Sequence, residues 1–469
     1  MTKLYKNYFI EISILFLFLL FVLFIMINKS TFDSGDSIQH YQMSHYSWQH
    51  PELFFNLWGK PFFTMLSSPF AQFGFKGIQV FNILVSVLSG YLVCKSANRL
   101  GYITSYLPLV VLFTATDYFL CMYSGLTEPL FGLILILSFY LIINDKFLAA
   151  SVVLSFLPFV RSEGNIILIV YAVYFIVKRK YIFIPLLMTG TIVYSIAGCF
   201  VFNDIGWVFN TNPYTSDYSN YGKGEPFHYV KQLNFVAGIP YCVLLVIGVV
   251  FFVTKFLKKN DWKNSPYQTE IFFLIFGAFF GYFVSHSIFW WKGLFHSFGM
   301  SRVLIGILPI GVIICLGPVD ALLKKYSPKY ILPVLSVLMI AFLFSGNKAA
   351  FDLKSDFALA PAQALAMEMN EWYKVNYPGK PIAIAAPHIA YVMDKDCFDP
   401  KQCSSISAIN EKIPSDRLII WDNWMSVIEF QLTDQKLRSD QRLILLKTFS
   451  NDKDTLKIYM SNEKSIIKN

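Results

Sequence analysis

Apolar runs of about 17–25 residues recur along this chain, and each is long enough to cross the roughly 30 Å of hydrocarbon in a bilayer. The 469 residues are 55% hydrophobic and only 15% charged, and the mean hydropathy is +0.50. Soluble domains carry about 25% charged residues. The sequence therefore predicts a mainly α-helical, polytopic membrane protein.

About eleven transmembrane helices are expected from the apolar runs. They lie at roughly 8–28, 78–97, 104–123, 127–144, 147–161, 164–178, 181–202, 236–257, 270–289, 300–317 and 330–346. The first run follows Lys3 and Lys6 and has no small-residue cleavage site after it. This pattern favours an uncleaved anchor over a signal peptide.

The basic residues gather in alternate loops. One side of the expected bilayer holds Lys3, Lys6, Lys95, Arg99, Lys146, Lys178, Arg179, Lys180, Lys255, Lys258, Lys259, Lys263, Lys324, Lys325 and Lys329. The positive-inside rule makes that side cytoplasmic. The net charge of +9 is therefore a topology signal and gives no reason to expect nucleic acid. With an odd number of spans, the N-terminus is cytoplasmic and the C-terminal region extracytoplasmic. Residue usage favours a bacterial inner (plasma) membrane.

Two domains are expected. Residues 1–346 form a transmembrane domain with outer loops at 29–76 and 203–235, and the second loop should be irregular because it is rich in Asn, Tyr, Gly and Pro. Residues 347–469 contain a helical stretch at 361–378 and strand-like runs at 381–387, 417–422, 442–450 and 455–460, which predict a small extracytoplasmic α/β domain. Cys397 and Cys403 form a disulfide there or stay reduced, and the sequence leaves both alternatives open.

Ionisable residues outside the cytoplasmic clusters converge on the outer surface. They are Asp33, Asp36 and Lys60 in the first outer loop, Glu128 at the start of the fourth span, Arg161 and Glu163 between spans five and six, and Lys292, His296 and Arg302 around span ten. Ionisable groups at membrane depth are unfavourable by roughly 2.5–3.5 kcal/mol each at a helix centre, so such a set needs a reason.

Each of these residues has a simpler explanation. Glu128 can stabilise the first turn of its helix, and Arg161 can pair with Glu163 at the interface. Arg302 and Lys292 can bind lipid head groups, and Lys60 can be an ordinary interfacial lysine. One of Asp33 and Asp36 can simply form a turn. His40, His45 and His50 recur every five residues, which is not a usual ligand spacing, so no metal site is assigned to them.

The whole set fits a catalytic pocket better than any single member does. A carboxylate can take a proton from an acceptor hydroxyl or amine. Lysine and arginine can hold the phosphate of a lipid-linked sugar. Trp58 and its aromatic neighbours can stack on sugar rings, although an interfacial aromatic belt is the commoner role.

These residues resemble motifs of the type C (GT-C) glycosyltransferases, multispanning enzymes that use polyprenyl-phosphate sugars and include protein O-mannosyltransferases and bacterial aminoarabinose transferases of lipid A. The first outer loop carries Asp33 and Asp36, and late in it stands Gly59-Lys60-Pro61. Arg161-Ser162-Glu163-Gly164 follows the fifth span and is similar to the Arg-Pro-Glu-Gly of many members.

The resemblance implies a role for each position. Asp36, with Asp33 as the second choice, would be the catalytic acid of the first loop. Lys60 and Arg161, together with Arg302, would bind the donor phosphate. Glu128, Glu163, His296 and Trp58 would line the substrate pocket. No cofactor is certain, and a divalent metal stays open because Asp33 and Asp36 do not form a tight acidic pair.

We therefore expect an inverting, hexosyltransferase-like enzyme that transfers a sugar from a polyprenyl-phosphate donor to a glycan, lipid or protein acceptor at the outer face. The alternatives are a transporter or flippase of lipid-linked sugars, a glycan polymerase or ligase, and a noncatalytic scaffold. Transporters favour midplane charges and inverted repeats. This chain has surface charges and no visible repeat.

Overall fold

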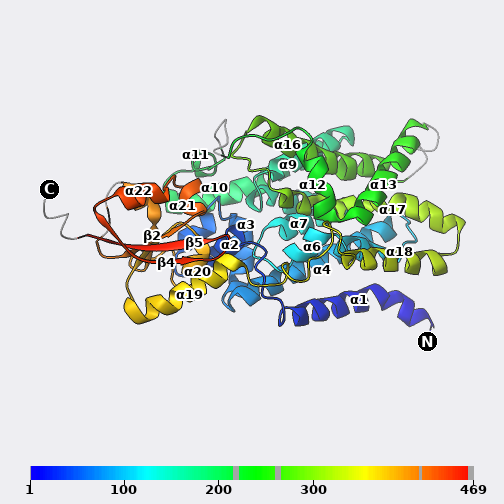
Figure 1. Ribbon diagram of the computed structural model, residues 1–469. Coiled ribbons are helices and arrows are strands. Elements are labelled where there is room, and N and C mark those ends of the chain that lie inside the picture. Colours follow the sequence, from blue (N-terminus) through cyan, green and yellow to red (C-terminus); the bar gives the residue numbers. More distant parts are fainter. Residues whose placement is uncertain (1, 215–220, 259–265, 411–412, 414, 463–469) are drawn as a thin grey trace.

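The computed structural model describes residues 2–214, 221–258, 266–410, 413 and 415–462. Figure 1 shows an elongated molecule with a bundle of helices at one end and a mixed sheet at the other. Helix α1 (Thr2–Phe24) runs along the bundle, and helices α2 (Asp36–Tyr46) and α3 (Pro61–Ala71) lie between the bundle and the sheet.

The bundle has the apolar helices that the sequence predicts. Among the described residues, five helical stretches are long and apolar enough to cross a membrane, namely Phe75–Arg99, Tyr181–Phe202, Ile239–Leu257, Gln268–Lys292 and Ser301–Lys325. The same part of the chain has five shorter apolar stretches, which are Tyr8–Phe24, Glu128–Ile142, Phe147–Phe159, Gly164–Val177 and Pro328–Leu343. Their main helices are α4 (Phe75–Arg99), α7 (Glu128–Ile142), α8 (Phe147–Leu154), α9 (Gly164–Val177), α10 (Thr189–Phe202), α13 (Ile239–Leu257), α16 (Ala278–Lys292), α17 (Leu308–Lys325) and α18 (Pro328–Leu343). The expected fold of a mainly helical, polytopic membrane protein is confirmed.

The apolar run at 104–123 is not one continuous helix. It forms α5 (Leu107–Phe113) and α6 (Thr116–Cys121), with Ala115 in an extended conformation between them. The hydroxyl of Thr116 donates a hydrogen bond to the carbonyl oxygen of Ala349 at 2.8 Å. This bond ties the first residue of α6 to a distant part of the chain, and the continuous span expected here was wrong.

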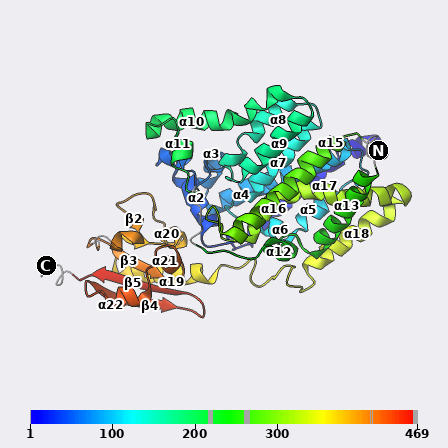
Figure 2. The same cartoon turned by 90° about the horizontal axis from the view of Figure 1, so that it is seen from above.

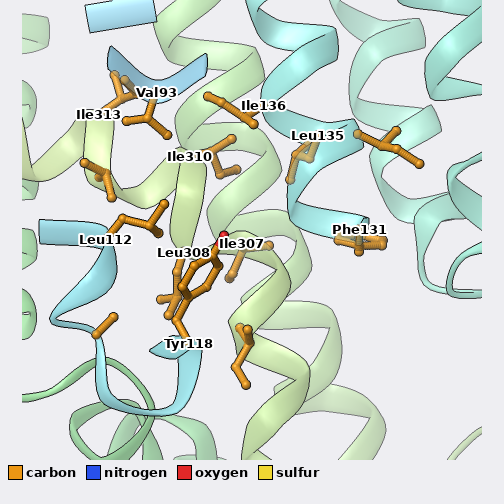
Figure 3. Packing of buried hydrophobic residues seen from close by; sticks show 14 of the residues in the cluster. Val93, Leu112, Tyr118, Phe131, Leu135, Ile136, Ile307, Leu308, Ile310 and Ile313 are labelled. Carbon is orange, nitrogen blue, oxygen red and sulfur yellow. The ribbon is translucent and has the colours of Figure 1, made fainter. Parts of the chain in front are cut away.

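The bundle core is formed by branched and aromatic side chains at the centre of the helices. Figure 3 shows Val93 of α4, Leu112 of α5, Leu135 of α7 and Ile310 of α17 packed together, and all four are fully buried. Helix α7 approaches the start of α17 closely at Gly132, where an added Cβ would lie 2.9 Å from Pro309 Cγ. Small residues permit such close packing in membrane bundles.

Both outer loops contain helices that the sequence analysis did not assign. Residues 29–76 form α2, the 3₁₀-helix η1 (Pro51–Phe55) and α3, and the hydroxyl oxygens of Ser44 and Ser67 join α2 to α3 at 2.7 Å. The loop 203–235 was expected to be irregular, but it contains α11 (Trp207–Asn210) and most of α12 (His228–Ala237). Residues 215–220 of that loop lie outside the described part of the chain.

The C-terminal region forms a five-stranded mixed sheet in the order β2-β1-β3-β5-β4. Its elements are α19 (Pro361–Asn376), β1 (Ile382–Ile384), α20 (Pro387–Val392), β2 (Cys403–Ser405), β3 (Leu418–Asp422), α21 (Met425–Ile428), α22 (Asp434–Ser439), β4 (Leu443–Ser450) and β5 (Thr455–Ser461). Leu418 and Ile420 pack on the face covered by α19, while Ile419 and Trp421 pack on the opposite face. A strand covered on both faces explains the continuous apolar run at 418–421.

The sheet region is docked on the first outer loop. His50 Nε2 lies 2.8 Å from Asp396 Oδ2, and the Gln363 amide donates to Thr31 Oγ1 at 2.6 Å. Figure 2 shows the sheet beside α2, and α20 packs against that helix. Cys397 and Cys403 are both free thiols. Of the two alternatives for this pair, the structure has the reduced one.

Candidate active site

The two acids of the first outer loop meet one arginine. Arg302 pairs through Nη1 with Asp33 and through Nη2 with Asp36. Asp33 Oδ1 also accepts hydrogen bonds from the backbone amides of Gly35 and Ser37, each at 2.9 Å. Within the described chain, no hydrogen bond engages the second oxygen of Asp36, Oδ1. Asp33 is therefore held at both oxygens, whereas Asp36 keeps one oxygen for another partner.

A second cluster continues directly from this one. Glu128 Oε1 lies 2.6 Å from Arg161 Nη1 and 3.5 Å from Arg302 Nε. Arg161 Nη2 lies 3.2 Å from Glu163 Oε1, and His286 Nε2 lies 3.6 Å from the same oxygen. Carboxylates and guanidinium groups thus alternate from the first loop to helix α16.

Helix N-termini position the carboxylates. Asp36 is the first residue of α2, Glu128 is the first residue of α7, and Glu163 precedes the first residue of α9. The partial positive charge at a helix N-terminus stabilises an adjacent carboxylate by about 0.3–1 kcal/mol, and by up to about 2 kcal/mol where the pair is partly buried. The helix-stabilising role expected for Glu128 and its place in the pocket are therefore compatible.

Lys60 approaches the same site from the start of α3. Its Nζ atom donates a hydrogen bond to the hydroxyl oxygen of Tyr214 at 2.7 Å and lies 4.2 Å from the centre of that ring. No carboxylate pairs with it in the described part of the chain. Lys60 has a φ of 63° and precedes Pro61 at the start of α3. A left-handed non-glycine residue is unfavourable by about 1–3 kcal/mol, and such strain gathers at functional sites.

These side chains line one cavity of about 830 Å³. Asp36, Lys60, Arg161, Arg302, Glu128, Glu163, His296 and Trp58 are all part of its wall. The remaining wall includes Tyr214 and Tyr221 of the second outer loop and Trp424, Met425 and Glu429 of the C-terminal sheet region. Asp33 does not line this cavity but faces a smaller one beside it.

Burial and ion pairing set the protonation states. Burial raises the pKa of Asp36, but the Arg302 guanidinium and the other charges nearby together outweigh burial, and the pKa falls below the ordinary 3.8. Burial dominates for Asp33, whose pKa is raised. Burial raises the pKa of Glu163 as well, yet Arg161 brings it down to about 2. Burial lowers the pKa of His40 to about 3, so its ring is neutral.

The structure places the candidate site residues around the larger cavity except for Asp33, which lines the smaller one, and Lys292 of the outer-surface set lines neither; the structure also adds other residues. His40 stacks on Trp58 with ring centres 5.1 Å apart. His286 is a histidine within a long apolar run, a signal that could have identified it. Tyr214 and Trp424 carried no such signal, because aromatic residues are frequent throughout the chain.

The divalent metal left open by the sequence finds no ligand set here. The described residues contain no group of three His, Cys, Asp or Glu side chains that could hold a metal ion. Asp33 and Asp36 are both engaged by Arg302. The residues present therefore do not fit a bound metal, and no step is assigned to one.

One solved structure has a fold similar to that of this chain. No family model matches the chain, and no curated protein matches it. Its structure is similar to the crystal structure of ArnT from Cupriavidus metallidurans bound to undecaprenyl phosphate, with a TM-score of 0.61 and 8% sequence identity. The similarity covers 95% of this chain and 97% of that chain, so the two share their overall fold over nearly their full lengths.

Proposed function

We propose that this protein is a membrane glycosyltransferase that moves a sugar from a polyprenyl-phosphate donor to an acceptor at the outer face, with inversion at the anomeric carbon. One observation carries the proposal: Asp36, which has an open carboxylate oxygen, and Lys60, which has no carboxylate partner in the described chain, line the same cavity. The fold shared with ArnT, whose crystal structure holds undecaprenyl phosphate, supports a polyprenyl-phosphate lipid as the partner.

We assign Lys60 the role of binding the phosphate of the donor. Arg161 and Arg302 are already paired with buried carboxylates, so their positive charge is largely balanced. Lys60 contacts the hydroxyl group of Tyr214 and no carboxylate in the described chain, so its charge is available to a phosphate. The two arginines hold the acids in place at the edge of the cavity that would receive the phosphate.

We assign Asp36 the role of orienting the acceptor and taking its proton. The acceptor oxygen or nitrogen attacks the anomeric carbon as the bond from that carbon to the phosphate oxygen breaks, and the electron pair leaves with the polyprenyl phosphate. The acceptor proton passes to Asp36 Oδ1. Because the attacking atom enters opposite the leaving phosphate, one such displacement inverts the anomeric configuration. Its lowered pKa makes Asp36 a weak base, so its main work is to orient the acceptor and stabilise its developing positive charge.

The membrane assignment follows the distribution of basic residues. The cavity and the sheet region would face the extracytoplasmic side of a bacterial inner membrane, with the N-terminus in the cytoplasm. The sugar is expected to be a hexose or a related sugar. The acceptor is a glycan, a lipid or a protein.

The test uses the purified full-length protein in nanodiscs with a synthetic undecaprenyl-phosphate hexose. The Asp36→Asn variant should lose about 10²–10⁴-fold in transfer rate, as is typical when a positioned acid or base is removed. Asp399→Asn is the matched control, because Asp399 is a half-buried aspartate whose carboxylate accepts hydrogen bonds from Lys401 and Gln402 and lines neither cavity.

Nuclear magnetic resonance of the product gives the anomeric configuration. An inverted product that Asp36→Asn fails to form supports the proposal. Full turnover by Asp36→Asn, or movement of the lipid across the bilayer without a covalent change, contradicts it.

A further inference from the structure

A second cavity of about 280 Å³ lies between the first outer loop and the C-terminal sheet. Asp36, Arg302 and Trp424 line both this cavity and the larger one, so the two spaces meet at the proposed catalytic carboxylate. The volume is below the range of about 300–1,000 Å³ typical of sites for drug-sized ligands. It suits a single sugar unit.

His388 is the unexplained polar group in this cavity. It is the second residue of α20, it is 6% exposed, and it lines the wall. In the described chain, neither of its ring nitrogens makes a hydrogen bond of ordinary geometry, although the backbone of Ser34 lies near the ring. A buried polar group without a partner is unfavourable by about 1–3 kcal/mol. The ring is therefore poised for a ligand in the cavity that it lines.

The neutral ring of His388 is chemically matched to a hydroxyl group. Burial lowers its pKa from the ordinary 6.5, although the Asp422 carboxylate acts in the opposite direction. A neutral imidazole presents one N–H donor and one lone pair. A hydroxyl has both complementary functions, whereas a phosphate oxygen can only accept from it.

The charges in the wall argue against an anionic ligand. Asp33, Asp36, Asp422 and Asp454 line the cavity and face Arg302 as the one basic side chain in it. Asp422 already accepts hydrogen bonds from the Trp424 amide at 3.0 Å and the Ser426 hydroxyl at 2.8 Å, so it holds a turn in the sheet region. Arg302 is already paired with two of these carboxylates, and among the described residues no lysine comparable to Lys60 lines this cavity, so an uncharged ligand suits it better than a phosphate or a carboxylate.

The apolar part of the wall can support a sugar ring. Trp424 is 47% exposed and lines the cavity together with Met300 and Met425. An indole face presents a large apolar surface to the C–H face of a pyranose, and its edge remains available to polar groups. The cavity therefore offers an apolar platform, a donor–acceptor pair at His388 and an open carboxylate oxygen at Asp36.

We propose that the smaller cavity is the acceptor subsite, that it binds an uncharged sugar unit, and that His388 selects this unit by hydrogen bonding to a hydroxyl next to the attacking one. The assignment rests on the proposed glycosyl transfer. The attacking hydroxyl oxygen bonds to the anomeric carbon of the donor, the polyprenyl phosphate leaves with the electron pair, and the proton passes to Asp36. His388 acts as a positioning residue and takes no proton.

The experiment measures acceptor kinetics with the full-length protein in nanodiscs. The donor is an undecaprenyl-phosphate hexose, and the acceptors are a neutral methyl hexoside and the matching methyl uronoside, which carries a carboxylate. His388→Phe should raise the KM of the neutral acceptor by about tenfold, the effect of losing roughly 1.4 kcal/mol of binding, with a much smaller change in kcat. His388→Asn, which keeps one donor and one acceptor, should recover most of the loss. His45→Phe is the control, because His45 bonds to Ala71 within the first loop and lines neither cavity.

Two further readouts separate the possible failures. Release of polyprenyl phosphate by the wild type reports on glycosyl transfer or hydrolysis, and its absence would remove the proposed function and this assignment with it. If release occurs, an unchanged acceptor KM in a folded His388→Phe variant overturns the subsite alone, and so does a preference for the uronoside. Saturation-transfer magnetic resonance with the methyl hexoside gives the same comparison without turnover, since contact with the wild type should weaken in His388→Phe.

Discussion

The guanidinium of Arg161 lies 2.6 Å from Oε1 of Glu128, a carboxylate that has no exposed surface. The same oxygen lies 3.5 Å from Nε of Arg302. One buried carboxylate thus links the arginine of the loop between α8 and α9 to the arginine that holds Asp33 and Asp36. The position of the proposed catalytic carboxylate depends on Glu128 through Arg302.

Replacing Glu128 should therefore lower the stability of the protein more directly than it alters the transfer reaction. Glu128→Gln removes the charge and leaves two buried guanidinium groups with one fewer carboxylate. Loss of one partner from a buried ion pair destabilises a protein by about 3–5 kcal/mol. Thermal unfolding of the purified protein in detergent, followed by intrinsic fluorescence, should show a clear fall in Tm.

Glu371→Gln serves as the matched control for that measurement. Glu371 pairs with Lys374 on the exposed face of α19, where 75% of its side chain is accessible. An exposed pair of this kind contributes about 0–1 kcal/mol. Equal shifts in Tm for the two variants would contradict the central role of Glu128.

Gly125 sets the distance between the first loop and the start of α7. Its amide donates to Ser37 Oγ at 2.8 Å, and an added Cβ would lie 2.2 Å from the carbonyl oxygen of Ser37. Gly125→Ala should displace the first turn of α2, which carries Asp36, and lower the transfer rate by at least about tenfold, in line with overpacking energies of about 1–3 kcal/mol. The Gly281→Ala change, whose added Cβ would have Val170 Cγ2 as its nearest neighbour at 3.7 Å, should retain the rate. Full activity of Gly125→Ala would show that this contact does not position Asp36.

Glu163 should give the protein a measurable pH dependence of stability. Its pKa falls from the ordinary 4.5 to about 2 in the folded chain because Arg161 stabilises the carboxylate. Its stabilising contribution is complete above pH 4.5 and is lost as the pH falls toward 2. Measured across this window, Tm should fall less steeply for Glu163→Gln than for the wild type. Parallel curves would contradict the ion pair between Arg161 and Glu163.

Much of the helical bundle could be predicted from the sequence. A segment that crosses a bilayer must be a long apolar helix, and the lengths of the apolar runs match this requirement. The apolar run at 104–123 was wrongly predicted to be one continuous helix, and the reason is physical. Apolar content alone does not register the hydrogen bond between the Thr116 side chain and Ala349, 233 positions away in the chain. Within the C-terminal sheet, four of the five strands coincide with apolar runs, and β2 (Cys403–Ser405) was too short and polar to detect.

The site was recognisable as a set of ionisable residues, but their pairing was not. The sequence suggested that Arg302 binds lipid or donor phosphate, which stays a prediction, and it gave no sign that Arg302 holds Asp33 and Asp36. Pairings between residues more than 260 positions apart depend on how the helices pack, and no local pattern encodes them. Trp424 could not be predicted as part of the cavity wall for the same reason. It reaches the first loop only because the sheet region docks there, which no local sequence pattern encodes.

The most direct test of the whole account is a structure of the protein in nanodiscs with bound undecaprenyl phosphate. The account predicts phosphate density in the larger cavity, with an oxygen at roughly 2.7–3.2 Å from Lys60 Nζ and on the same side as the open oxygen of Asp36. The density should disappear in Lys60→Met. Phosphate bound at the other end of the bundle, beside Lys178 or Lys324, would contradict the account.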